Sequence, residues 1–266
     1  MVKGNLIIIG GAEDKKGECR ILKFLADLAG GASARLTILT TATESPEKAG
    51  SEYTSVFQRL GVANITILNI KNRDEANNDN ISRIITESTG VFFTGGDQLR
   101  ITSILGGTKV FTALHDAYTK GTVIAGTSAG ASAMSGTMIV DGNNNDPARK
   151  CTLKMAPGLG LLEDVLIDQH FHQRGRIGRL LCGVAENPFI LGIGIDEDTA
   201  VRVFPDMHLE VVGSNSVTVV DGRNIKSSNV SELNPDENLA IANVTLHVLP
   251  GGYGYDLKSR EVLRLH

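Results

Sequence analysis

Residues 122–132 read TVIAGTSAGAS, a short apolar run that leads directly into a segment of residues with little or no side chain. Residues 126–130 fit the pattern G-x-S-x-G, in which a serine stands on a tight turn between a strand and a helix. Small neighbours are needed because the bend brings the flanking backbones together. Two interpretations remain open for Ser128: a simple glycine turn, or a nucleophile presented to substrate beside helix N–H groups that can hold an oxyanion.

Similar apolar runs recur along about the first 195 residues and alternate with helical patterns. The runs do not alternate with polar residues, as is typical of strands buried on both faces. They lie at residues 6–9, 36–40, 65–70, 91–93, 123–125, 165–167 and 190–195, and the clearest helical patterns at residues 17–28, 98–105, 109–119 and 173–184. Strands that alternate with helices predict an α/β fold with an open, mostly parallel sheet and helices on both faces.

After Asp198 the pattern changes to short alternating or β-branched segments, at residues 200–204, 209–212, 217–220 and 243–249. Turns such as Asp221-Gly222 separate them, so we predict antiparallel strands at the sheet edge or in a small C-terminal extension. No linker, repeat or low-complexity tract interrupts the chain, and we expect a single domain over residues 1–266. The polar loop at residues 141–150 is long enough to border a site.

Charge and cysteine content exclude several classes of protein. The 266 residues carry a formal net charge of −4, which argues against a general binder of nucleic acid or anionic membranes. Cys19, Cys151 and Cys182 are odd in number and far apart, which predicts three reduced thiols rather than a disulfide framework or a zinc site. No apolar run approaches the length of a membrane span, and we expect a cytoplasmic protein.

A second glycine corner, FFTGGDQ at residues 92–98, also follows a predicted strand and opens a predicted helix. The carboxyl ends of parallel strands meet at one edge of a sheet, so this corner and the Ser128 turn should lie together. Its N–H groups could supply half of an oxyanion hole. Asp97 could equally be an ordinary helix N-cap.

The segment IDQHFH, residues 167–172, offers the base that a serine nucleophile needs. In a strand, His170 and His172 would share a face with Asp168, which leaves a metal site as a weaker alternative because no third strong ligand is evident nearby. A regular strand would turn Gln169 and His170 to opposite faces. We therefore predict that the strand ends or twists at about Gln169.

Two charged segments complete the set. RGRIGR, residues 174–179, places three guanidinium groups directly after the candidate base; they are either solvated surface or a site for a carboxylate. GIDEDT, residues 194–199, ends a buried run in three acids. These acids either cap a turn, or one of them fixes the tautomer of His170 as the third member of a catalytic triad.

Taken together, FFTGGDQ, GTSAGA (residues 126–131), IDQHF, the spacing of the three arginines and GIDEDTA (residues 194–200) resemble the cyanophycinase family, serine-type peptidases related to aspartyl dipeptidase. The motifs spread from about residue 90 to residue 200, in the family's order. The resemblance implies a flavodoxin-like α/β fold of the class I glutamine amidotransferase type. It also implies that no metal or cofactor is needed and that the enzyme is a homodimer.

The resemblance further implies Ser128 as nucleophile, His170 as base and Glu197 as orienting acid. Backbone N–H groups near Gly96 and Ala129 would hold the oxyanion. The resemblance also implies a substrate-binding pocket formed by Gln98, Asp168, Gln169, Arg174, Arg176 and Arg179. The implied substrate is cyanophycin, an arginine-decorated poly-aspartate, and the implied product is the β-aspartyl-arginine dipeptide. The arginines would then clamp the substrate carboxylate, and Asp168 or another acid would meet its guanidinium.

Three other readings stay open. An α-aspartyl dipeptidase of the same fold would need only a short pocket, whereas the arginine cluster favours the polymer enzyme. A lipase-like esterase would place its acid before its histidine in the chain. A non-catalytic α/β binding module could use Gly10-Gly11 and Gly95-Gly96 to hold an anion, but no phosphate-binding motif stands at a strand end.

Overall fold

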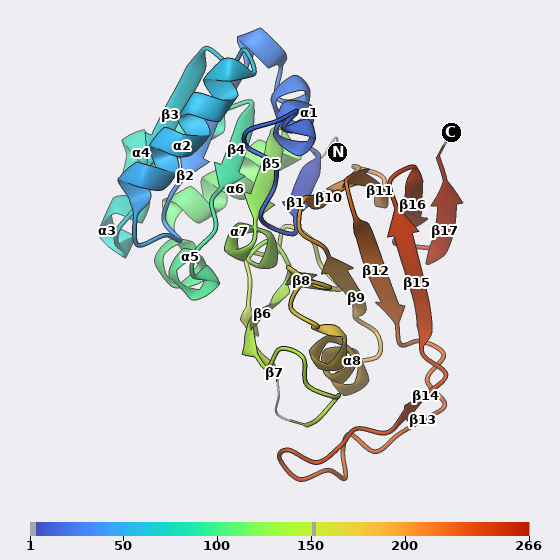
Figure 1. Cartoon of the computed structure of the whole chain (residues 1–266). Coiled ribbons are helices and arrows are strands. Elements are labelled where there is room, and N and C mark those ends of the chain that lie inside the picture. The colour runs from blue at the N-terminus through green and yellow to red at the C-terminus, as the bar shows by residue number, and fades with distance from the viewer. Residues whose placement is uncertain (1–3, 151–152, 266) are drawn as a thin grey trace.

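The largest sheet has nine strands, in the order β17-β16-β11-β10-β1-β5-β4-β2-β3 (Figure 1). The computed structural model describes residues 4–150 and 153–265, so Cys151 lies outside the described residues. Five of the strands run parallel to one another: β1 (Leu6–Ile9), β2 (Arg35–Leu39), β3 (Asn64–Leu68), β4 (Gly90–Phe93) and β5 (Val123–Thr127). The other four extend the sheet antiparallel from β1: β10 (Thr199–Val203), β11 (His208–Gly213), β16 (Tyr253–Asp256) and β17 (Glu261–Arg264).

Helices cover both faces of the parallel strands, which explains why these strands are apolar throughout. In β1, Ile7 and Ile9 pack in one core with α1 (Arg20–Leu28) and α2 (Pro46–Arg59). Leu6 and Ile8 point to the opposite face and join a second core with α4 (Asp79–Glu87), α5 (Gln98–Leu105) and α6 (Lys109–Thr119). The predicted α/β fold, with a parallel core and C-terminal antiparallel strands, is confirmed.

A second sheet of four strands lies below the first in Figure 1, in the order β15-β12-β9-β8. It contains β8 (Val165–Gln169), β9 (Leu191–Ile195), β12 (Ser216–Asp221) and β15 (Thr245–Pro250). The apolar runs at residues 165–167 and 190–195 were predicted to lie in the same open sheet as the earlier strands, and this prediction is wrong. β5 is already paired with β1 and β4, and the other edge of β1 is taken by β10, so no edge beside β5 is free for β8.

Two predicted helices begin later than their apolar patterns suggested, because turns precede them. The Asp14 carboxylate accepts hydrogen bonds from the backbone N–H groups of Lys16, Gly17 and Cys19, which holds the chain in a turn until α1 begins at Arg20. Similarly, α8 (Ile177–Glu186) begins four residues after the predicted start. It packs on the second sheet through Leu180 and Val184.

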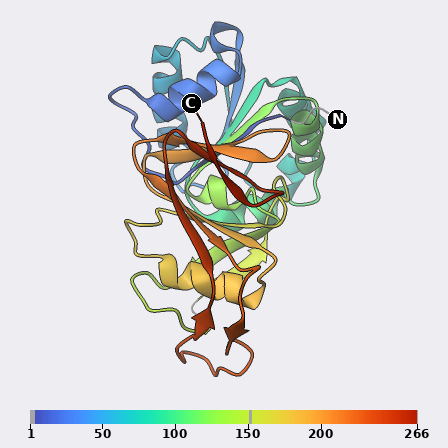
Figure 2. The same cartoon turned by 90° about the vertical axis from the view of Figure 1, so that its right-hand side faces the viewer.

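Two small hairpins complete the described fold. β6 (Thr137–Gly142) pairs with β7 (Leu153–Pro157), so the polar loop at 141–150 joins two strands that the sequence analysis did not predict. β13 (Ser227–Ser228) and β14 (Ile241–Ala242) lie at the end of the molecule away from the nine-stranded sheet (Figures 1 and 2). The other short elements are η1 (Gly31–Ser33), α3 (Arg73–Ala76) and α7 (Ala129–Ser132). None of the helices within residues 4–150 and 153–265 has the length and apolar character to cross a membrane.

Candidate active site

Ser128 stands on the sharp turn between β5 and α7. Its φ of 53° lies in the left-handed region, which is strained for a residue with a side chain. The two glycines of the motif have no room for a side chain: a Cβ on Gly126 would lie 2.5 Å from the Gly130 carbonyl oxygen, and one on Gly130 would lie 2.7 Å from the Phe93 carbonyl oxygen. The turn therefore requires the small residues that the sequence provides, and it leaves the Ser128 side chain partly exposed.

The side chains of Ser128, His170 and Glu197 form a continuous chain of hydrogen bonds. The Ser128 Oγ lies 3.0 Å from His170 Nε2, and His170 Nδ1 lies 2.6 Å from Glu197 Oε1. If Nδ1 carries the proton and donates it to the carboxylate, Nε2 is free to accept the hydroxyl proton of Ser128. This is the arrangement that activates a serine as a nucleophile.

The position of His170 depends on a break in β8. The strand ends at Gln169, and His170 takes a φ of 47°, so the predicted change of direction at this point is confirmed. The His170 N–H donates to the Gly10 carbonyl oxygen at 2.8 Å, which ties the turn to the end of β1. The imidazole thereby leaves the second sheet and meets Ser128, which belongs to the first.

His170 is nearly buried, with 8% of its surface exposed. Burial lowers its pKa below the ordinary value of 6.5, because desolvation disfavours the charged imidazolium. The hydrogen bond that His170 Nδ1 donates to Glu197 opposes this shift, while the positive charges of Arg174 and Arg176 add to it. The lowered pKa favours the neutral imidazole, which is the form that acts as a general base.

Gly11 supports the imidazole, although the sequence analysis considered it only as part of an anion cradle. Its φ is +100°, and a Cβ at this position would lie 2.5 Å from His170 Nε2. Glycine is therefore required here both by the backbone and by the ring. The signal in the sequence was the glycine pair after the first strand, but only the fold shows that His170 covers it.

The second glycine corner lies directly against the nucleophile. A Cβ on Gly95 would lie 3.4 Å from the Ser128 Cβ, and Gly96 has a φ of +144°. Asp97 accepts a hydrogen bond from the Leu99 N–H at 2.8 Å, so the ordinary N-cap reading of Asp97 is confirmed. Ala129 is the first residue of α7, where N–H groups have no acceptor within the helix.

Asp168 is completely buried and is occupied by two arginines. Its Oδ2 accepts from Arg179 Nε at 2.7 Å, and its Oδ1 accepts from Arg179 Nη2 and, at 3.3 Å, from Arg176 Nη1. Of the two predicted alternatives for the substrate guanidinium, Asp168 or another acid, Asp168 is buried and both of its oxygens are used within the protein.

Arg176 and Arg179 are each only 5% exposed, so they are not open to a substrate carboxylate as the sequence analysis expected. Burial lowers the pKa of Arg176 to about 10, against the favourable charge of Asp168. Arg176 Nη1 also donates to the Gln169 side-chain oxygen at 3.1 Å. Arg174, by contrast, is exposed, and its guanidinium makes no ion pair with the residues that the structure describes. It is the arginine of this cluster that a carboxylate can reach.

The polar loop at 141–150 borders this network. The Asn144 side-chain oxygen accepts from Arg176 Nε at 2.8 Å, and the Gly142 carbonyl accepts from Arg179 Nη1 at 3.1 Å. Gln98 is tied to β6, because its amide nitrogen donates to the Ile139 and Val140 carbonyls, each at 2.8 Å. Its side-chain oxygen is left for another donor.

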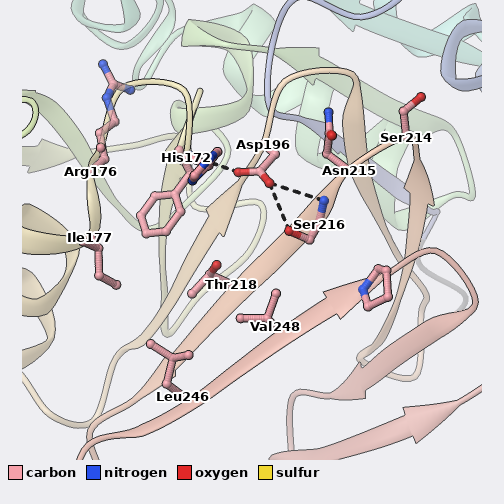
Figure 3. Close-up of a pocket in the computed structure, with 13 residues that line it drawn as sticks. His172, Arg176, Ile177, Asp196, Ser214, Asn215, Ser216, Thr218, Leu246 and Val248 are labelled. Carbon is pink, nitrogen blue, oxygen red and sulfur yellow. Dashed lines mark hydrogen bonds between the residues drawn. The ribbon is translucent and has the colours of Figure 1, made fainter.

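His172 does not join His170. Its backbone N–H donates to Asp196 Oδ1 at 3.0 Å, and both residues line a separate cavity of about 650 Å³ against β12 and β15 (Figure 3). Apolar side chains such as Leu246 and Val248 form the floor of that cavity. Within the described residues, no three or more His, Cys, Asp or Glu side chains gather as a metal site requires.

Comparison with known proteins shows the family to which the chain belongs. The model of peptidase family S51 matches residues 6–211. The chain is 37% identical over 261 residues to a cyanophycinase of Synechococcus elongatus, which covers 98% of this chain and 81% of that protein. It is 38% identical over 262 residues to a cyanophycinase of Nostoc sp. (strain PCC 7120), covering 98% and 88% of the two chains. A cyanophycinase of Geminocystis herdmanii is 35% identical over 261 residues, covering 98% and 96%.

Two solved structures share the fold at low sequence identity. A peptidase from an acI-B1 Actinobacterium aligns with a TM-score of 0.64 at 20% identity, covering 92% of this chain and 98% of that one. A putative peptidase E protein from Listeria monocytogenes EGD-e aligns with a TM-score of 0.56 at 15% identity, covering 80% and 100%. Since the family model and the relatives span most of the chain, we conclude that it belongs to peptidase family S51, as a serine peptidase homologous to cyanophycinases.

Proposed function

We propose that this peptidase hydrolyses cyanophycin to β-aspartyl-arginine dipeptides through an acyl-enzyme on Ser128. The observation that carries the proposal is the hydrogen-bond chain from Ser128 Oγ to His170 Nε2, at 3.0 Å, and from His170 Nδ1 to Glu197 Oε1, at 2.6 Å. The named relatives, which span nearly the whole chain, supply the substrate class.

Acylation begins when the Ser128 Oγ attacks the carbonyl carbon of a backbone amide and His170 Nε2 takes its proton. Glu197 holds the Nδ1 proton and stabilises the imidazolium. N–H groups near Gly96 and Ala129 hold the oxyanion of the tetrahedral intermediate. The C–N bond then breaks as His170 returns its proton to the leaving nitrogen, and a water molecule activated by His170 hydrolyses the ester.

Substrate binding uses the charges of each polymer unit, which carries an arginine α-carboxylate and a guanidinium. We propose that exposed Arg174 receives the carboxylate, because Arg176 and Arg179 are engaged with buried Asp168. The buried network positions the loop from Gln169 to Arg174, in which the catalytic histidine lies, and Gln98 holds the neighbouring strand β6. We further propose that the enzyme acts as a homodimer in the cytoplasm, which sedimentation and cell fractionation would test.

An α-aspartyl dipeptidase of the same fold is the alternative, and the burial of Arg176 and Arg179 favours it as the second candidate, because fewer arginines of this cluster are open to substrate carboxylates. Incubation with cyanophycin, followed by mass spectrometry of the products, separates the two proposals. We expect β-aspartyl-arginine to accumulate, and Ser128→Ala to abolish it while the protein remains folded. Cleavage of aspartyl dipeptides with cyanophycin left intact would establish the alternative, and turnover by the Ser128→Ala protein would refute the triad.

A further inference from the structure

A cavity of about 230 Å³ opens beside Ser128, and nothing described so far accounts for it. Its walls come from the loop after β1, from α2, from the end of β4 and from the nucleophile turn. None of them comes from β8 or α8, which carry the arginine network. The polar side chains that matter are Glu13, Lys15, Glu52 and Tyr53. The cavity therefore offers a second approach to the nucleophile, with a different charge character.

Glu13 is a buried carboxylate in the wall of this cavity, with 4% of its surface exposed. Its Oε1 accepts from the Tyr53 hydroxyl at 2.5 Å and its Oε2 from the Thr127 hydroxyl at 2.6 Å. No arginine, lysine or histidine of the described chain forms an ion pair with it. Buried carboxylates are ordinarily paired with a cation, and two hydroxyl donors leave other lone pairs unused.

Tyr53 remains a neutral hydrogen-bond donor in this arrangement. Burial and the neighbouring charge of Glu13 raise the pKa of its phenol well above the ordinary value of 10. Its ring is therefore an uncharged aromatic face beside two carboxylates, Glu13 and Glu52. A carboxylate next to an aromatic face is a common way for proteins to hold an ammonium or guanidinium group.

The ammonium group of Lys15 already lies between the Tyr53 ring and Glu52. Lys15 Nζ stands 4.4 Å from the centre of the Tyr53 ring and 3.4 Å from Glu52 Oε2. The Lys15 side chain is about one quarter exposed and that of Glu52 about one half, so the contact is accessible from solvent. An exposed ion pair of this kind is weak and can exchange for a better-fitting cation.

We propose that this cavity is a subsite for the guanidinium group of the substrate, and that the Lys15 ammonium is displaced when the guanidinium binds. The subsite rests on the proposed function for the identity of its ligand, an arginine side chain next to the scissile bond. The subsite supplies an acid for the substrate guanidinium, which Asp168 cannot do because its oxygens are used within the protein. Arg174 then receives the carboxylate, and half-exposed Glu52 receives the guanidinium on the side of α2, over the Tyr53 ring and near the buried negative charge of Glu13.

Binding of two matched ligands tests the subsite without turnover. N-acetyl-arginine and N-acetyl-citrulline have the same carboxylate and nearly the same shape, but only the first carries a positive charge. Dissociation constants measured by calorimetry or NMR should favour the arginine ligand about tenfold in the wild type, the usual order for one added charge-assisted contact. Glu52→Gln should reduce this preference to about twofold, and Lys15→Met should tighten the arginine ligand severalfold by removing the competing cation.

Glu47→Gln is the matched control, because Glu47 is an exposed acid on the same helix α2 and does not line the cavity. It should bind both ligands as the wild type does. Equal affinity for the two ligands in the wild type would overturn the subsite, as would a preference that Glu52→Gln leaves intact. Weaker arginine binding by Lys15→Met would contradict displacement. None of these results depends on cyanophycin hydrolysis, so failure of the proposed function would be seen separately.

Discussion

Replacing Gly11 by alanine tests whether the position of the His170 ring, rather than its chemistry alone, sets the rate. The added Cβ would lie 2.5 Å from His170 Nε2 and 3.0 Å from Nδ1, where ordinary contacts begin at 3.4 Å. The ring must therefore retreat by about 1 Å. A retreat of that size takes the Ser128 Oγ to Nε2 distance from 3.0 Å to beyond hydrogen-bond range.

The expected loss follows from that displacement. A misplacement of about 1 Å in a catalytic group costs roughly 100-fold in rate, or about 2.7 kcal/mol in activation free energy. Backbone strain adds about 1–3 kcal/mol to the cost of folding, because alanine is disfavoured at a φ of +100°. We therefore expect Gly11→Ala to fold with reduced stability and to lose about 100-fold in kcat.

Gly61 supplies a control with the same backbone strain and no neighbour. Its φ is +91°, and no heavy atom would lie within 4 Å of an added Cβ. Gly61→Ala should lose similar stability in urea unfolding and keep its kcat. Turnover of cyanophycin by both variants, compared at equal folded concentration, isolates the steric effect. If kcat of Gly11→Ala lies within about threefold of Gly61→Ala, the reasoning about ring position is refuted.

Three further predictions concern charge. Arg176→Ala should lower the free energy of unfolding by about 1.5–3 kcal/mol, because it removes one of the two cations that bond to buried Asp168 while Arg179 stays. Urea unfolding would measure this, and unchanged stability would contradict the network. The acid limb of the kcat/KM profile should have its midpoint below pH 6.5, because burial lowers the pKa of His170 and the base therefore stays neutral to lower pH. Arg174→Gln should move that midpoint upward, because it removes a positive charge that lowers the His170 pKa. A downward shift would count against His170 as the base. A chelator should leave turnover unchanged, whereas loss of activity restored by zinc would revive the metal reading.

The nucleophile turn could be predicted because its requirements are local. Ser128 takes a left-handed φ, and a Cβ on Gly126 or Gly130 would clash with neighbouring backbone atoms. The conformation of the turn is therefore determined by five consecutive residues. The break after Gln169 was also predictable, because the strand period turns Gln169 and His170 to opposite faces. These features depend on backbone sterics over a few residues.

Membership of the sheets could not be predicted in the same way. The apolar runs at β8 and β9 are as strand-like as those at β1 and β5, yet they form a different sheet. The deciding fact is that β10 pairs with the edge of β1. The apolar sequence of a strand indicates that the strand is buried. The sheet edge with which it pairs depends on other strands that are distant in the chain.

The sequence by itself determined where strands end in tight turns and which reactive residue types stand at those turns, because these depend on steric rules between neighbours. Only the tertiary structure decided which charges meet. The turn from Gln169 to Arg176 places the start of α8 beside the end of β8, where Arg176 and Arg179 enclose Asp168. Arg174, within the same turn, stays exposed. Ionic partners are chosen by three-dimensional distance and burial, which a linear pattern of charges does not contain.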